Sequence, residues 1–287
     1  MDIVDAHCHM WRLEVAQRSW LTPEFGPLLQ TFDPATFSEA SRDLGVKQCV
    51  LVEAGKTSED NRVLEQMADS NLVGAVIPFV NLESPNFEGD LDHWQLHPKF
   101  RGVRMGFENH ADFKILARPT IIRGLTILAE RGLIFEFLVR VHHLKDLLEI
   151  YRRIPELKGV IEHMAKPDVA AGSDHEEWQH QMRRLARETN VSCKLSLSPR
   201  VEQLEVLLKN LGSGWLVERL TSYVQFVVAE FGFDRLMWGS DWPIALLVSD
   251  YAGTYQALRR AVGVLSTADE LRLFQDTAVR FYGLAHP

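Results

Sequence analysis

The feature that most constrains the fold is the regular alternation of short apolar runs with longer segments of helical pattern. Most of these runs are apolar on both faces, as expected for strands of a parallel sheet that is covered on both sides. Each gap between two runs is long enough for a helix, which parallel strands require for their connections. We predict eight strands, at residues 2–6, 47–53, 72–80, 101–105, 133–139, 158–162, 191–196 and 235–239.

Helix signals fill the gaps between these runs. Asp33 is a candidate N-cap, Pro34 suits a first helical turn, and Gly45 suits the end of the same helix. Apolar residues recur with helical spacing in several other gaps. We predict helices within residues 33–45, 116–131, 143–155 and 176–189, two more within 200–231 that are broken near 211–214, and a last one from 267 toward 282.

Eight strands that alternate with helices predict a (β/α)8 (TIM) barrel, and 287 residues is a typical length for one. An open doubly wound sheet is the alternative, but no glycine-rich turn follows the first run, so no dinucleotide site is indicated. We therefore predict one barrel domain over residues 1–287. Residues 10–32, which are rich in aromatic residues and prolines, are predicted to be a loop insertion over the barrel mouth.

Composition excludes some functions. The net charge of −8 argues against nucleic-acid binding, which needs a basic face, although a few local cations could still hold a small anionic substrate. No run of about 18 apolar residues is present to cross a membrane. The start of the chain does not resemble a signal peptide. The three cysteines, Cys8, Cys49 and Cys193, lie in apolar stretches and suggest reduced thiols, so we expect a cytoplasmic protein.

Polar residues collect where the predicted strands end, and the active site of a barrel lies at the carboxyl ends of its strands. Three of these ends are unusually polar: residues 5–9 (DAHCH), 161–167 (IEHMAKP) and 239–243 (GSDWP). His7 and His9 are two residues apart and so point to the same side of a strand. His163 and Asp241 are remote in sequence, but a barrel brings all strand ends around one axis.

Imidazoles and a carboxylate are the ligands of a divalent transition metal such as zinc or manganese. We therefore predict one metal site made by His7, His9, His163 and Asp241. Asp5 is expected to support these groups rather than to bind the metal.

Other polar residues have simpler explanations. Glu53 and Glu136 are expected to form salt bridges, and His142 and His143 to lie in the first turn of the helix after the fifth strand. His93 and His97 have helical metal-site spacing, but no HExxH motif is present and they are expected at the surface.

The motifs DAHCH, KFRGVR, IEHMAKP, CKLS and WGSDWP, in this order, resemble the amidohydrolase superfamily. More narrowly, they resemble the amidohydrolase-related branch that contains sugar-lactone hydrolases and pyrone dicarboxylate lactonase. The resemblance spans nearly the whole chain. It implies a distorted (β/α)8 barrel and hydrolysis by an activated water, with Asp241 as general base and His163 beside it.

The resemblance also places basic residues in the pocket, at Arg101, Arg104 and Lys194. Arg101 and Arg104 are three apart and face opposite ways on a strand, so at most one of them should point into the pocket. Trp11 is expected to line it. The chain departs from the family pattern at Glu53, Met105, Glu162 and Leu197, which bears on the substrate more than on the chemistry. No lysine is placed to bridge two metals.

We predict a lactonase that opens a sugar-derived or carboxylated lactone, with a small-molecule lactone as its partner and a homo-oligomer as a possible assembly. A metal-dependent non-oxidative decarboxylase is the alternative, since it would use the same ligands with a different pocket. A DNase of the TatD type shares the opening DxHxH but is disfavoured by the negative net charge. A scaffold without activity is disfavoured by the intact His7, His9, His163 and Asp241.

Overall fold

The computed structural model describes residues 1–169, 175–196 and 212–287, with the backbone alone for 212–217. It has a strand at each of the eight predicted positions. All of the paired strands are parallel. They are β1 (Ile3–Cys8), β2 (Val46–Val52), β3 (Val73–Ile77), β4 (Gly102–Arg104), β5 (Ile134–Phe137), β6 (Lys158–Ile161), β7 (Ser192–Leu195) and β8 (Leu236–Trp238).

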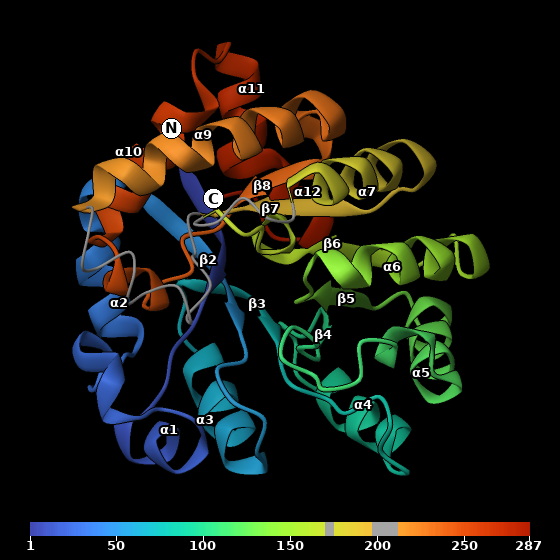
Figure 1. Cartoon of the computed structure of the whole chain (residues 1–287). Helices are drawn as coiled ribbons and strands as arrows, with labels where there is room; N and C mark the ends of the chain where they lie inside the picture. The colour runs from blue at the N-terminus through green and yellow to red at the C-terminus, as the bar shows by residue number, and fades with distance from the viewer. Residues whose placement is uncertain (170–174, 197–211) are drawn as a thin grey trace.

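The helices lie outside these strands (Figure 1). The α-helices are α1 (Leu13–Ser19), α2 (Pro34–Ser41), α3 (Ser58–Ala68), α4 (Phe87–Gln95), α5 (Pro119–Glu130), α6 (Val141–Arg153), α7 (His175–Glu188), α9 (Gly212–Phe231), α10 (Tyr251–Val262), α11 (Thr267–Leu271) and α12 (Thr277–Tyr282). Short 3-10 segments are η1 (Pro23–Leu28), η2 (Arg42–Leu44), η3 (Ile115–Ala117), η4 (Glu162–Ala165), η6 (Phe233–Arg235) and η7 (Ile244–Leu247), and η8 (Arg272–Asp276) is a π-helical turn.

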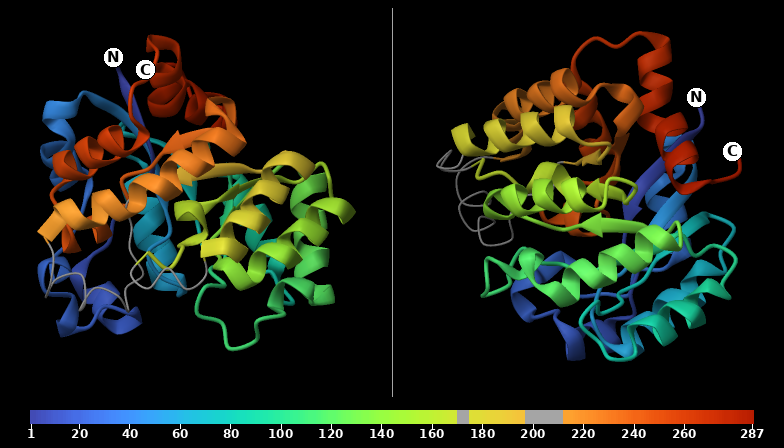
Figure 2. Two further views of the ribbon diagram at one scale, coloured as in Figure 1. Left: turned by 45° about the horizontal axis from the view of Figure 1, so that its top comes forward. Right: turned by 90° about the vertical axis from the view of Figure 1, so that its right-hand side faces the viewer.

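The strands bury both of their faces, as the apolar runs predicted. On β2, Cys49 and Leu51 join the core that packs against the helices, whereas Val50 and Val52 join a second cluster inside the barrel. Residues of α12 complete this inner cluster. The barrel interior is therefore apolar at the end where α12 packs, and Figure 2 shows both termini on that side of the molecule.

The barrel consists of two hydrogen-bonded sheets. Strands β1–β3 form one sheet and β4–β8 form the other. Among the described residues, the strand pairing between the sheets is limited to isolated bridges, between Cys8 and Trp242 at one seam and between β3 and the chain around β4 at the other. We call these two boundaries the β8–β1 seam and the β3–β4 seam. This interrupted pairing agrees with the distortion expected of the (β/α)8 barrel.

At the β8–β1 seam, the buried carboxylate of Asp5 links the two sheets. Its Oδ1 accepts hydrogen bonds from the backbone N–H of His7 at 3.0 Å and of Ser240 at 2.9 Å. Its Oδ2 accepts from the hydroxyls of Ser240 and Tyr251 at 2.6 and 2.8 Å. Gly239 allows the close approach, because a Cβ there would lie 2.5 Å from Cβ of His7.

At the β3–β4 seam, a buried ion pair has the same effect. Arg104, at the end of β4, donates from Nε to Oε1 of Glu53 at 2.8 Å and from Nη2 to the Glu53 carbonyl at 2.6 Å. Glu53 follows β2, so the ion pair joins a residue of each sheet. The predicted salt bridge of Glu53 is thus present.

The helix predictions hold in most places. Asp33 caps α2, and Gly45 ends the following turn with φ of 74°. The last helix is divided into α11, η8 and α12, and its N-cap is Ser266. Of the two helices predicted within 200–231, α9 accounts for the second, while the first falls largely outside the described residues.

Residues 10–32 contain α1 and η1, and the two ends of this segment pair with each other. The backbone N–H of Trp11 donates to the carbonyl of Phe32 at 2.9 Å, and the reverse bond has the same length. The segment is therefore a closed excursion after β1, with more regular structure than the predicted loop.

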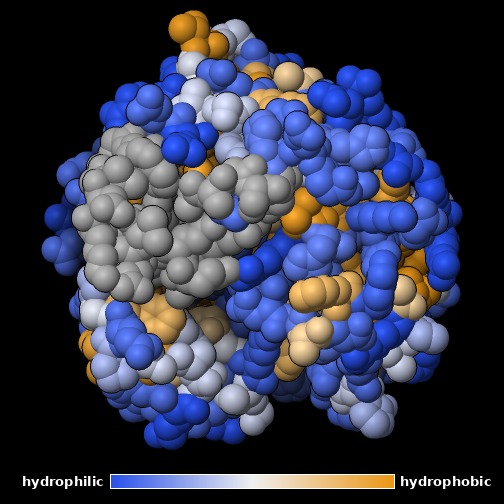
Figure 3. Space-filling view, in the orientation of Figure 1, coloured by the Kyte–Doolittle hydropathy of each residue, from blue (hydrophilic) through white to orange (hydrophobic). Residues whose placement is uncertain are grey.

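The surface that Figure 3 shows is mainly hydrophilic, with small separate hydrophobic patches. Among the described helices, none is both long and apolar enough to cross a membrane.

We expect Asp5→Ala to lower the free energy of unfolding by about 3 kcal/mol, because several buried donors lose their acceptor at once. Tyr251→Phe is the matched control. It removes one hydrogen bond from the same carboxylate but leaves the link between the sheets, so we expect a loss of about 1 kcal/mol. Urea unfolding of the two variants tests this, and equal losses would show that Asp5 does not hold the seam.

Candidate active site

The four predicted metal ligands converge at the carboxyl ends of the strands. His7 and His9 come from β1 and the residue that follows it, His163 from the turn after β6, and Asp241 from the loop after β8. His9 Nε2 lies 3.1 Å from both His7 Nε2 and Asp241 Oδ1. Asp241 Oδ1 also lies 3.6 Å from His7 Nε2 and 3.9 Å from His163 Nε2. All four side chains are buried.

An unusual backbone brings His163 and Asp241 into this cluster. His163, Met164, Ala165 and Lys166 have φ between 45° and 61°, and Asp241 has φ of 56°. This left-handed region costs a residue with a side chain about 1–2 kcal/mol. Such strain is tolerated where the surrounding fold enforces it, and it is typical of functional sites.

Hydrogen bonds fix the orientation of the histidine rings. His9 Nδ1 lies 3.0 Å from the carbonyl of Val52, so Nδ1 carries the hydrogen and the lone pair of Nε2 faces the cluster. His163 Nδ1 lies 2.6 Å from the hydroxyl of Ser196. His7 Nδ1 accepts from the ammonium of Lys194 at 3.0 Å, so its ring hydrogen lies on Nε2.

The donor atoms fit a single divalent metal. Ligands placed about 2.1 Å from a tetrahedral zinc lie about 3.4 Å from one another. The separations among His7 Nε2, His9 Nε2 and Asp241 Oδ1 are 3.1, 3.1 and 3.6 Å. Two imidazoles and a carboxylate suit zinc or manganese. A metal here would take the place of the hydrogen on His7 Nε2.

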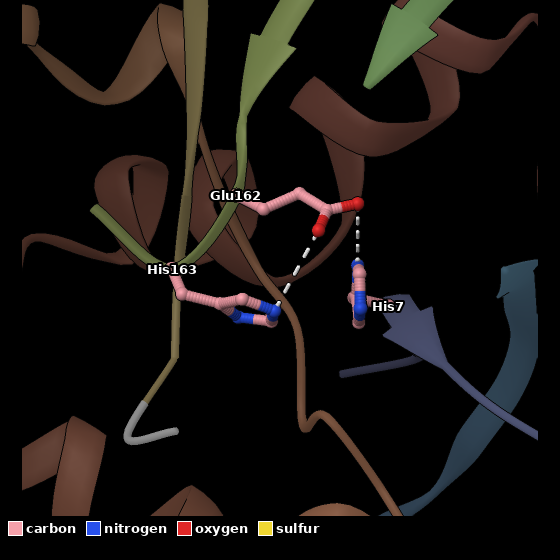
Figure 4. Close-up of side chains that lie close together, drawn as sticks. All are labelled: His7, Glu162 and His163. Atoms are coloured by element: carbon pink, nitrogen blue, oxygen red, sulfur yellow. Dashed lines mark ion pairs between the residues drawn. The ribbon is translucent and has the colours of Figure 1, made fainter. Parts of the chain in front are cut away.

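Glu162 adds a carboxylate that the sequence did not place at the centre. Figure 4 shows it between the rings of His7 and His163. Its Oε1 lies 3.8 Å from His7 Nδ1, and its Oε2 lies 3.8 Å from His163 Nε2. Oε1 has no hydrogen-bond partner among the described residues. His7, His163 and Glu162 thus form a second possible set of metal ligands, which shares two of the predicted four.

A buried ionic network underlies the cluster. Lys194 Nζ lies 2.6 Å from Glu136 Oε2, and Glu136 also accepts from the hydroxyl of Tyr282. Arg104 Nη1 donates to Glu162 Oε2 at 3.0 Å. This network places alternating charges under His7, and the predicted salt bridge of Glu136 is part of it.

Burial and the neighbouring charges set the pKa of these carboxyls in opposite directions. Burial raises the pKa of Glu162, and Arg104 only partly offsets this. Burial alone would also raise the pKa of Glu136, but Lys194 lowers it below the usual range. Two adjacent buried carboxyls therefore differ in their affinity for a proton because their nearest cations differ.

The pKa values of His7, His163 and Asp241 are also shifted. Burial lowers the pKa of His163 to about 4, against the pull of Asp241 and Glu162, and burial with Lys194 lowers the pKa of His7. For Asp241, burial alone would raise the pKa, but His163 and His9 lower it below the usual range. Near pH 7, His7 and His163 are therefore neutral, and the Asp241 carboxylate is ionised.

A cavity of about 640 Å³ opens above the cluster. His9, His163 and Asp241 form its floor. Its walls contain the aromatic residues Trp11, Trp20 and Phe25 on one part, and polar or charged residues on another, including Glu53, Lys56, Arg104, Glu108, His110 and Lys166. A small molecule in this cavity would contact Asp241.

Two of the predicted substrate-binding residues are not in this cavity. Arg101 lies before β4, at the opposite end of that strand, where it donates to the carbonyls of Tyr282, Pro98 and Phe100. Its prediction is wrong because a strand turns residues three apart to opposite sides, and Arg104 takes the inward position. Lys194 is fully buried under His7 and does not line the cavity, since its ammonium is held by Glu136.

Most of the other predictions fall where expected. Arg104 and Trp11 line the cavity, and His142 and His143 lie in the first turn of α6. His93 is exposed on α4, whereas His97, after the end of that helix, is half-buried. The three cysteines are free and buried, as predicted.

Sequence reasoning missed Lys166 and Glu108 as cavity residues. Their side chains form an ion pair of 3.0 Å at the cavity wall. Lys166 belongs to the IEHMAKP motif, three residues after His163, which was the available signal. On an extended strand, residues three apart point to opposite sides, so that spacing alone would not place both side chains in the same cavity.

Comparisons with known proteins agree with this architecture. The family model described as amidohydrolase matches residues 4–284. An L-fucono-1,5-lactonase from Burkholderia ambifaria is 32% identical over 99% of this chain and 96% of its own length. A 2-pyrone-4,6-dicarboxylate hydrolase from Comamonas testosteroni is 28% identical over 84% of this chain and 76% of its own.

A solved structure of an amidohydrolase from Burkholderia multivorans with bound zinc superposes with a TM-score of 0.89. Its sequence is 26% identical, and the match covers 99% of this chain and 100% of the other. The chain belongs to the amidohydrolase family, and the predicted resemblance is confirmed.

We expect Lys194→Met to lower the free energy of unfolding by about 3–5 kcal/mol, because it leaves the Glu136 carboxylate buried without its cation. Adding Glu136→Gln to this variant should restore a large part of the loss, since the second change removes the unpaired charge. Thermal or urea unfolding of the single and double variants measures the effect. Additive losses would contradict a buried ion pair.

Proposed function

We propose that the protein is a lactonase that opens a sugar-derived lactone, with Asp241 as the general base. The observation that carries this proposal is the position of Asp241. Its carboxylate lies between imidazoles on the floor of a cavity, in a chain of the amidohydrolase family that is 32% identical to an L-fucono-1,5-lactonase. The named relatives support lactone hydrolysis over decarboxylation, because both of those described above are hydrolases of cyclic esters.

In this reaction, Asp241 takes a proton from the water that attacks the lactone carbonyl. The ring C–O bond then breaks, and Asp241 returns the proton to the ring oxygen, which becomes the hydroxyl of the product. His9 Nε2 lies 3.1 Å from Asp241 Oδ1, so the imidazole lone pair and the carboxylate face the same point on the cavity floor. His163, whose pKa of about 4 keeps it neutral, takes part through hydrogen bonding rather than charge.

One divalent metal, zinc or manganese, would be held by His7, His9, His163 and Asp241. When bound, it would supply Lewis-acid polarisation of the carbonyl and a lower pKa of the attacking water. The solved relative with zinc and the donor geometry of this chain support a metal here.

The charges around the cavity favour a neutral, hydroxyl-rich lactone over a carboxylated one. Arg104 is held by the carboxylates of Glu53 and Glu162, and Lys166 by that of Glu108. Of the described lysines and arginines that line the cavity, the remaining one, Lys56, is exposed. A substrate carboxylate would have to displace one of the existing carboxylates, whereas hydroxyls can share both partners of an ion pair.

The aromatic side of the cavity suits the same substrate class. The rings of Trp11 and Trp20 pack edge to face with their centroids 5.3 Å apart, and the centroids of Phe25 and Trp20 are 5.5 Å apart. All three belong to residues 10–32, which we propose cover the barrel mouth. Apolar ring faces of a sugar can pack on such side chains while its hydroxyls face the charged wall.

We expect the protein to hydrolyse neutral aldono-1,5-lactones, and to do so with a kcat/KM at least about tenfold higher than for pyrone dicarboxylates. Acid release with a pH indicator measures both reactions. In Asp241→Asn, hydrolysis should fall by several orders of magnitude, because the amide cannot accept the proton. Near-normal turnover in this variant would reject the general base, and a preference for the dicarboxylate would reject the substrate class.

We expect one equivalent of zinc per chain, with an affinity that falls at least about tenfold in His9→Gln, since one ligand is lost. Zinc titration by calorimetry measures this without reference to activity. His93→Gln is the matched control, because His93 is an exposed histidine on α4. Equal affinity in the two variants would place the metal elsewhere.

A further inference from the structure

We propose that Lys166 is a catalytic residue that binds the carbonyl oxygen of the substrate and stabilises the negative charge that develops there. The inference rests on the proposed lactonase function. It makes Lys166 the basic residue of the pocket that contacts the substrate, a position for which the sequence had suggested Lys194.

The position of Lys166 carries this proposal. It lines the same cavity as Asp241 and His163, and its residue exposure is only 7%. Its ammonium pairs with Glu108 Oε2 at 3.0 Å at the cavity wall. A lactone whose carbonyl carbon faces the water held by Asp241 would thus have Lys166 in the surrounding wall.

The backbone shows that this position is enforced. The four left-handed residues of η4 and its C-cap begin at His163 and end at Lys166. Within this turn, Met164 and Ala165 are buried in the apolar core, while His163 and Lys166 both face the cavity. Met164 is further held by Trp178, whose indole N–H donates to the Met164 carbonyl at 2.7 Å. Backbone strain of this kind is typical of functional sites, so a strained turn that presents two polar side chains to one cavity is expected where both side chains contact the substrate.

The other candidate cations in the cluster are committed to the protein. Lys194 is fully buried and bound to Glu136 and His7. Arg104 donates to the side chain and the carbonyl of Glu53 and to Glu162. Lys166 pairs with a carboxylate that is itself 17% exposed in its side chain, so water or a hydroxyl can replace part of that contact.

The electrostatics are consistent with this placement. Burial alone would raise the pKa of Asp241, and the charge of Lys166 is among the groups that lower it, after His163 and His9. The charge of Lys166 also contributes to the lowered pKa of His163. Its positive charge is therefore felt at the two residues that face the reacting carbonyl. A cation held at a largely buried position stabilises an oxyanion far better than the same cation in water.

Lys166→Met tests the proposal. We expect kcat for a neutral 1,5-lactone to fall by about 10²–10³, because the lost interaction forms chiefly in the transition state, while KM changes little. Lys166→Arg should keep a measurable part of kcat, since it restores a cation. Lys158→Met, at the exposed start of β6, controls for the change in net charge. If Lys166→Met does not fold, Lys166→Gln takes its place.

Glu108→Gln separates catalysis from a structural role. If Lys166 served only to hold Glu108, this variant would lose as much activity as Lys166→Met. We expect a loss of only several-fold, because the ammonium stays in the cavity. Equal losses in the two variants, an unchanged kcat in Lys166→Met, or an effect on KM alone would overturn the inference. A wild-type protein that hydrolyses no lactone would instead reject the proposed function, and the inference with it.

Discussion

The buried carboxylate of Asp5 is the interaction on which the site depends. Backbone pairing leaves the barrel as two sheets, and the cluster draws on both of them: His7 and His9 on one, His163 and Asp241 on the other. Asp5 binds the backbone of His7 and of Ser240 with a single oxygen, so it fixes the distance between the strand that carries the histidines and the loop that carries Asp241. The geometry at the centre follows from this link.

The same interior is built in two layers. Near α12 it is filled by aliphatic side chains, and toward the cavity it is filled by carboxylates, a guanidinium and an ammonium. Charges of opposite sign alternate there, which offsets the cost of burying each one. A transition from apolar to ionic packing along the barrel axis thus supports neutral rings at His7 and His163 and an ionised carboxylate at Asp241.

The sequence predicts the strands and the shared orientation of His7 and His9 well because both follow local rules. Apolar runs of this length recur in register with helices, and His7 and His9 share a face by simple alternation. The choice among the basic residues could not be predicted in the same way. Alternation alone allows one of Arg101 and Arg104, but which one faces inward depends on where β4 begins. Lys166 reaches the cavity only through a left-handed turn, and the residue types of that turn do not predict a left-handed backbone.

The two seams give the barrel lines along which it can open. Few backbone bonds cross them, so thermal fluctuations that separate the sheets cost less there than between paired strands. A ligand that binds His9 and Asp241 together spans the β8–β1 seam and links the two sheets. Such a ligand adds a connection where strand pairing is limited to an isolated bridge, and we expect binding to slow the exchange of amide hydrogens on both sides of the seam.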